Sequence, residues 1–266
     1  MDGLRQVWTV VAHELRGRWR SLLVWGVALG GLGALYVALY PTMSGFLNDY
    51  VKNAPESMRQ YLGGLQGPIS IEQWLEMELT TSIIPIALPF LVILTGSRTV
   101  AGREERKTLD LLLSNPLPRR HLVWGAALTM ALSLAAVLGL TWVLTYIAVP
   151  AAGAHLSAAH LAEGLVALWP FCLFFGTLAL LLSALIRRGV FATVISAVIL
   201  VLMYILNGLS QVSRSIEPVR VVSLFYQLRH PLSGDFPWTA VLVMLACAAV
   251  FLGGAMAAFA RRDVYT

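Results

Sequence analysis

Residues 21–40 read SLLVWGVALGGLGALYVALY and contain no charged side chain. A helix rises 1.5 Å per residue, so about 20 apolar residues cross the roughly 30 Å of hydrocarbon in a bilayer. Five further runs have the same character, and the six predicted spans cover residues 21–40, 79–96, 121–149, 165–186, 190–207 and 238–260. Of the 266 residues, 58% are hydrophobic and 12% are charged, whereas a soluble domain is about 25% charged. We therefore predict an all-α polytopic membrane protein with six transmembrane helices, forming one domain over residues 1–266.

The distribution of Lys and Arg residues predicts how these spans are oriented. Six spans place both termini and every second loop on one side, and 14 of the 19 Lys and Arg residues fall there. The other side holds the remaining five: Lys52, Arg59, Arg214, Arg220 and Arg229. Cytoplasmic loops carry an excess of Lys and Arg, so we predict that both termini lie in the cytoplasm. The membrane that we expect is the plasma (inner) membrane of a prokaryote. The net charge of +5 follows from this topology and does not indicate nucleic acid as a partner.

Residues 1–20, which precede the first span, have an amphipathic pattern. Apolar residues such as Leu4, Trp8, Val11 and Leu15 recur at helical spacing, with basic and polar residues on the other faces. Such a helix is suited to lie among membrane lipids at the cytoplasmic interface before the chain turns inward. We predict an interfacial helix here, and a short cytosolic helix packed on another protein remains the alternative.

The first predicted span also carries a face of small residues. Gly26 and Gly30 are four residues apart, with Gly33 close by. Small residues let helix backbones approach closely in a membrane. We expect this face to pack on a neighbouring helix, either within the chain or across a dimer. The alternative, glycines merely tolerated in an apolar helix, stays open.

The loop between the second and third spans reads GREERKTLDLLLSNPLPRR (residues 102–120). Three leucines at positions i, i+3 and i+4 form a short apolar stripe, and charges of opposite sign are spaced to pair along a helix. Two prolines then end the helix. We predict a short cytoplasmic helix that docks another protein, with a solvated connector as the alternative. The candidate docking residues are Glu104, Glu105, Arg106, Thr108, Leu109, Asp110, Leu112 and Leu113.

This loop resembles the segment between the second and third helices of ATP-binding-cassette (ABC) type-2 permeases. Thr108, Leu109 and residues 111–113 match the pattern of that family, and Asp110 stands where glutamate is usual. Two further stretches are similar to family segments, VVSLFYQLRHPL (221–232) before the last span and FARRDV (259–264) at its end.

The resemblance implies a half-transporter with a coupling helix between the second and third spans. Two permease chains, here expected as a homodimer, would form the pathway, and two cytosolic ABC ATPase subunits would bind ATP and Mg. The implied direction is export. The residues agree with a separate energy source, because no stretch matches the phosphate-binding pattern GxxxxGK[ST]. We therefore expect no cofactor and no enzymatic activity in this chain itself.

Other functions fit the sequence less well. An ion-coupled carrier or channel needs ionisable groups near mid-membrane, and the predicted spans hold such groups only near their ends. A non-transporting membrane assembly protein is a further alternative. We find no catalytic or metal-binding motif: His13 and Glu14 lack the second histidine of HExxH, and Glu72 and Glu76 are interpreted as a solvated outer face.

Overall fold

The computed structural model describes residues 2–53, 70–80, 84–105, 119–186, 188–212, 217–228, 231–234 and 236–261, and every regular element within these ranges is helical. Five of these helices are long and apolar enough to cross a membrane. They are α1 (Asp2–Asn53), α7 (Arg119–Ala148), α8 (Ala158–Leu185), α9 (Gly189–Val212) and α11 (Trp238–Arg261). A further apolar helix, α4 (Ile84–Thr99), has 16 residues. The all-helical membrane class is therefore confirmed, and the six predicted spans correspond to five long helices and one short one.

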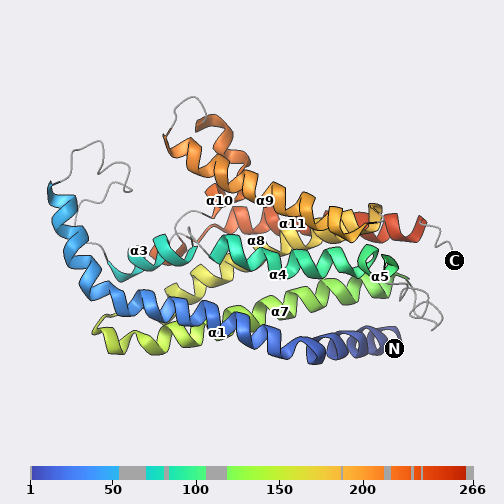
Figure 1. Cartoon of the computed structure of the whole chain (residues 1–266), viewed down its shortest axis with the longest axis horizontal. Helices are drawn as coiled ribbons and strands as arrows, with labels where there is room; N and C mark the ends of the chain where they lie inside the picture. The colour runs from blue at the N-terminus through green and yellow to red at the C-terminus, as the bar shows by residue number, and fades with distance from the viewer. Residues whose placement is uncertain are drawn as a thin grey trace.

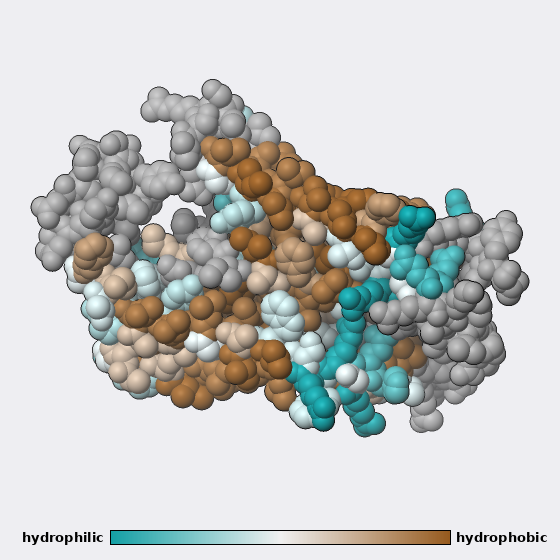
Figure 2. All heavy atoms as spheres, viewed as in Figure 1, coloured by the Kyte–Doolittle hydropathy of each residue, from teal (hydrophilic) through white to brown (hydrophobic). Residues whose placement is uncertain are grey.

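The long helices run side by side along the length of the molecule (Figure 1). The start of α1, the end of α11 and the short helix α5 (Ala101–Glu105) lie at the same end of this bundle, which we call the α5 end. Hydrophobic residues cover much of the bundle on the face shown in Figure 2, and hydrophilic residues gather towards the α5 end.

The N-terminal segment differs from the expectation, because residues 2–20 are not a separate interfacial helix. They form the first part of α1, which continues without a break to Asn53. Contacts with α7 explain this continuity, since they lie on both sides of residue 20: Val10 packs near Gly125, and Gly26 packs against Leu140. The parallel neighbour α7 therefore supports α1 on both sides of the expected turn.

The second predicted span, residues 79–96, also differs in its boundaries. It is preceded by α3 (Ile71–Leu75) and a π-helical segment, η1 (Glu76–Thr80), and the helix proper is α4. Ser70 caps α3, because its hydroxyl accepts from Gln73 N while the Gln73 side chain accepts from Ser70 N. Glu76 is only 3% exposed, so the interpretation of this acidic segment as a solvated face is wrong for that residue.

The segments at the end of the bundle opposite the α5 end are short. They comprise η2 (Pro150–Ala152), η3 (Glu217–Val222), α10 (Leu224–Gln227) and η4 (Pro231–Ser233). The Trp74 indole of α3 donates to Tyr36 O of α1 at 2.9 Å, and the Ser223 hydroxyl donates to Met203 O of α9 at 2.8 Å. These bonds attach the short segments at this end to the long helices α1 and α9.

Helix α8 is the centre of the bundle and contacts α4, α7, α9 and α11. Phe171 and Phe175 are fully buried on it. The backbone of α4 comes close to α8, because a Cβ atom built on Gly96 would lie 2.9 Å from Leu180 N and one built on Gly176 would lie 2.9 Å from Val92 Cβ. The paired glycines therefore allow α4 and α8 to approach more closely than side chains would permit. This contact positions the end of α4, where the candidate site begins.

Candidate functional site

A single turn residue, Val100, separates α4 from α5. A new helix begins with backbone N–H groups that have no carbonyl partner one turn earlier. The Ser183 hydroxyl on α8 accepts from two of them, Val100 N at 3.3 Å and Ala101 N at 3.0 Å. It also donates to Ser97 O at 2.8 Å. Ser183 is fully buried, so one side chain satisfies three backbone groups away from water.

The start of α9 lies against the same break. A Cβ atom built on Gly189 would lie 3.2 Å from Gly102 N and 3.3 Å from Ser97 O, so the close approach requires a residue without a side chain. The Gly189 N–H donates to Glu105 Oε1 at 3.1 Å. A carboxylate at this position is favourable because the N-terminus of a helix carries partial positive charge. Glu105 thus caps a helix that is distant from it in sequence.

A further hydroxyl pair joins α9 to α4. The Thr193 hydroxyl, one turn into α9, donates to Ser97 Oγ at 2.7 Å. We call the resulting set of residues the polar junction. It consists of Ser97 and Gly102 near the break, Glu105 on α5, Ser183 on α8, and Gly189 and Thr193 on α9. The polar junction links three elements of the bundle directly to α5.

Helix α1 reaches α4 one turn away from the polar junction. The Arg18 guanidinium donates to Thr95 Oγ1 at 2.7 Å, and the Thr95 hydroxyl donates to Leu91 O at 2.8 Å. Arg18 is partly buried, so a charge-assisted bond holds its head group against α4. The end of α4 is therefore contacted by α1, α8 and α9.

The predicted docking residues fall partly within the structure. Glu104 and Glu105 lie on α5, where Glu104 is partly buried and Glu105 is exposed. Glu105 also caps α9, a role that the sequence did not predict. The other six residues lie outside the described ranges: Arg106, Thr108, Leu109, Asp110, Leu112 and Leu113.

Sequence reasoning missed the polar junction. Ser183 and Thr193 are single hydroxyl residues in apolar helices, and no local pattern assigns them a partner some 80 to 100 residues away. Gly189 follows two arginines between two apolar runs, which indicates a tight hairpin but not its contact with Gly102. One feature of the sequence does relate these three residues: all of them lie near the same predicted surface of the membrane.

The three glycines of α1 lie against α7 of the same chain. A Cβ atom built on Gly26 would lie 2.7 Å from Leu140 Cδ2, and one built on Gly30 would lie 2.8 Å from Leu144 Cβ. Gly33 faces Thr145 in the same way. All three glycines are buried. The small-residue face therefore packs within the chain.

Comparison with known protein families places the chain in a family of membrane proteins. The sequence model of a family described as ABC-2 family transporter protein matches residues 8–264. No curated protein matches the chain. The matched region contains most of α1 and every other described helix, so the polar junction lies inside it.

Replacing Ser183 with alanine tests the polar junction. The Ser183→Ala change leaves two buried N–H groups and one carbonyl without their hydroxyl partner. Unsatisfied buried groups cost about 1–3 kcal/mol each, partly relieved by relaxation. We expect the free energy of unfolding in detergent to fall by about 1–3 kcal/mol. Ser196→Ala is the matched control, because Ser196 is equally buried but bonds only its own helix at Ala192 O. Equal losses in the two variants would contradict the role of Ser183.

A bulky residue on the glycine face tests the contact between α1 and α7. Gly30→Leu would force a side chain against Leu144 and the backbone of Thr141, and overpacking of this kind costs about 1–3 kcal/mol. We expect a lower thermal midpoint for the purified chain. Gly31→Leu makes the same change one residue away, where a Cβ atom meets nothing within 4 Å, and should leave the midpoint unchanged. A Gly30→Leu variant as stable as Gly31→Leu would show that the contact does not stabilise the fold.

Proposed function

The chain belongs to the ABC-2 family of transporter proteins, and from this premise we propose that it is the membrane subunit of an ABC exporter, driven by separate ATP-binding subunits. As a multi-pass permease of this family it works with an ABC ATPase subunit rather than as an enzyme. We propose that two such chains form the translocation pathway as a homodimer and that two ATPase subunits dock from the cytoplasm. ATP and Mg would bind to those subunits.

The orientation in this proposal assigns the α5 end to the cytoplasm of a prokaryotic cell, with six spans crossing the inner membrane. Two observations support it. The start of α1, the end of α11 and α5 lie together (Figure 1), as six spans require. The chain segments assigned to that end carry 14 of the 19 Lys and Arg residues, in keeping with the excess of positive charge in cytoplasmic loops.

The observation that carries the proposal is the polar junction. Residues 103–114 are proposed to dock the ATPase subunit, and the first of them belong to α5. Through Ser183 and Glu105, α5 is bonded to α8 and α9, and it follows directly after α4. A displacement of the docked segment would therefore act on three helices at once. This is the mechanical connection that a coupling helix requires.

The proposed dimer needs a surface for the second chain. Helix α9 leaves large apolar residues exposed at helical spacing, including Phe191, Val194, Val198 and Leu202. Such a face in a membrane bundle is covered either by lipid or by another helix. We assign it to the second permease chain, which would contact α9 close to the polar junction.

Charge reversal in the docking segment tests the proposed partner. Asp110→Lys should weaken co-purification of the ATPase subunit about tenfold, which corresponds to about 1.4 kcal/mol, because it replaces an attractive rim contact with a like-charge one. It should also lower ATP hydrolysis by the ATPase subunit when the two subunits are reconstituted together. Asp110 serves better than Glu105, because a change at Glu105 would also remove the cap on α9.

The control for this experiment is Glu56→Lys, which reverses a charge on the opposite predicted side. It should leave both co-purification and hydrolysis unchanged. Wild-type behaviour of Asp110→Lys in both assays would mean that residues 103–114 are only a connector.

Cysteine labelling tests the orientation. In a background with Cys172 and Cys247 replaced, a single cysteine at Ser157 should react with a membrane-impermeant maleimide in intact cells, because Ser157 is exposed between η2 and α8. Ser57→Cys should behave in the same way. Ser114→Cys should react only after the membrane is permeabilised. Labelling of position 114 in intact cells would overturn the proposed topology.

A further inference from the structure

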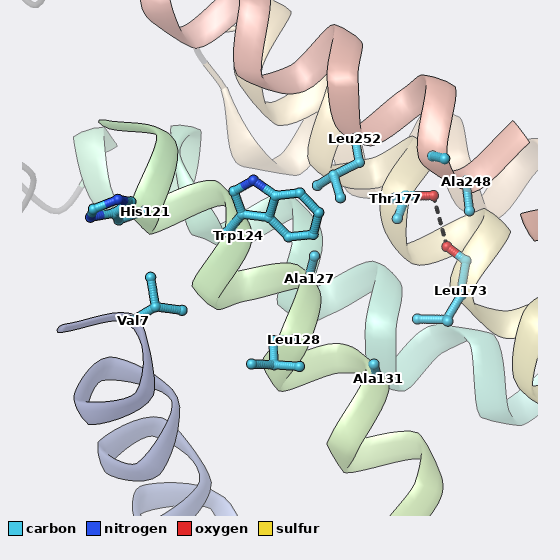
Figure 3. Close-up of a pocket in the computed structure, with 11 residues that line it drawn as sticks. Val7, His121, Trp124, Ala127, Leu128, Ala131, Leu173, Thr177, Ala248 and Leu252 are labelled. Carbon is cyan, nitrogen blue, oxygen red and sulfur yellow. Dashed lines mark hydrogen bonds between the residues drawn. The ribbon is translucent and has the colours of Figure 1, made fainter. Parts of the chain in front are cut away.

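A groove of about 820 Å³ lies between α1, α7, α8 and α11 on the side of the bundle. Its volume falls within the roughly 300–1,000 Å³ of pockets that hold small molecules. Figure 3 shows His121 and Val7 at one end of the groove and Ala131, Leu173 and Ala248 at the other, with Trp124 between them. Trp124 is half exposed, so the groove opens beside it at the surface of the bundle.

The groove extends from the α5 end to the middle of the bundle. His121 lies in the first turn of α7, whereas Leu173 lies at the middle of α8 and Ala248 near the middle of α11. On α7 it runs from His121 to Ala131, which is about 15 Å at 1.5 Å per residue. One leaflet of a bilayer contributes about the same thickness of hydrocarbon, half of roughly 30 Å. The groove therefore has the length of one acyl chain in the leaflet at the α5 end.

The deep part of the groove is almost entirely apolar. Its lining there consists of alanine and leucine side chains and Thr177. The Thr177 hydroxyl donates within its own helix, to Leu173 O at 2.8 Å (Figure 3) and to Phe174 O at 3.1 Å. An apolar chain would meet apolar walls along this part.

The end at His121 has the opposite character. The imidazole of His121 forms part of the groove wall here, with its Nδ1 buried away from solvent. The adjacent Arg120 is exposed, and both residues belong to the first turn of α7, the positive end of that helix. Among the described residues that line the groove, none carries a carboxylate. A hydrogen-bonding, negatively charged group is therefore complementary to this end.

We propose that the groove binds one anionic phospholipid of the leaflet at the α5 end. One acyl chain occupies the apolar part between α7, α8 and α11, and the phosphate lies beside His121 and Arg120. The site requires only that the bundle lies in a bilayer, so it does not depend on the docking of an ATPase subunit. It is also separate from the polar junction, because no residue of the polar junction is among the described residues that line the groove.

Native mass spectrometry of the full-length chain in detergent tests the site, with dioleoyl phosphatidylglycerol and dioleoyl phosphatidylcholine as probes. We expect one tightly bound phosphatidylglycerol per chain, held at least fivefold more tightly than phosphatidylcholine. Glycerol phosphate, which has the anion but no acyl chains, should not bind detectably. Equal binding of the two lipids by the wild-type chain would overturn the assignment of the phosphate to His121 and Arg120.

Two variants address the two parts of the site separately. Ala249→Phe places a ring in the groove from α11 and should weaken phosphatidylglycerol binding at least tenfold. Ala246→Phe is its matched control, an exposed alanine on the same helix that does not line the groove. Arg120→Gln should remove the preference for phosphatidylglycerol, whereas Arg188→Gln, at another exposed arginine of the same end, should retain it.

Arg120 is exposed, so its replacement tests the site even if Ala249→Phe disturbs the fold. Unchanged lipid binding in a folded Ala249→Phe variant would overturn the proposal. If the Ala249→Phe variant lost the dimer but kept its lipid, the proposal would also be overturned, because the groove would then bind a second copy of the chain.

Discussion

A helix that ends among other apolar helices leaves backbone N–H groups that water cannot satisfy, and the α5 end of this structure depends on how that problem is solved. In hydrocarbon each unsatisfied group costs several kcal/mol. The break at Val100 is possible because Ser183 accepts from two of these groups and donates to a carbonyl of the preceding helix. The break is therefore fixed relative to α8, and with it the start of α5.

A hydroxyl can serve a neighbouring helix in this way only where the backbones approach closely. Gly96 and Gly176 allow that approach between α4 and α8, and Gly102 and Gly189 allow it between the break and α9. Small residues and hydroxyls are therefore two parts of one arrangement. In a membrane, where burial of apolar surface does not favour one helix pair over another, such contacts determine which helices pack together.

The sequence predicted the parts of this fold that depend on hydrophobicity alone. The long apolar runs gave the five long helices, and the run from residue 79 gave α4 with a shifted start. It did not predict the continuity of α1 through residue 20, because that depends on contacts with α7 on both sides of the expected turn. Nor could it pair Ser183 with Val100 or Glu105 with Gly189, since a single hydroxyl or carboxylate carries no information about a partner distant in sequence.

Glu105 lies where the bundle and the proposed docking segment meet. Its carboxylate accepts from Gly189 N while its side chain is exposed, and a carboxylate can accept several hydrogen bonds at once. A carboxylate at an exposed helix N-terminus contributes about 0.3–1 kcal/mol. A docked subunit that attracted Glu105 would thus change the start of α9 at small cost, and α9 would respond because Gly189 packs directly on Gly102. In the proposed transporter this contact connects docking to a span that is remote from residues 103–114 in sequence.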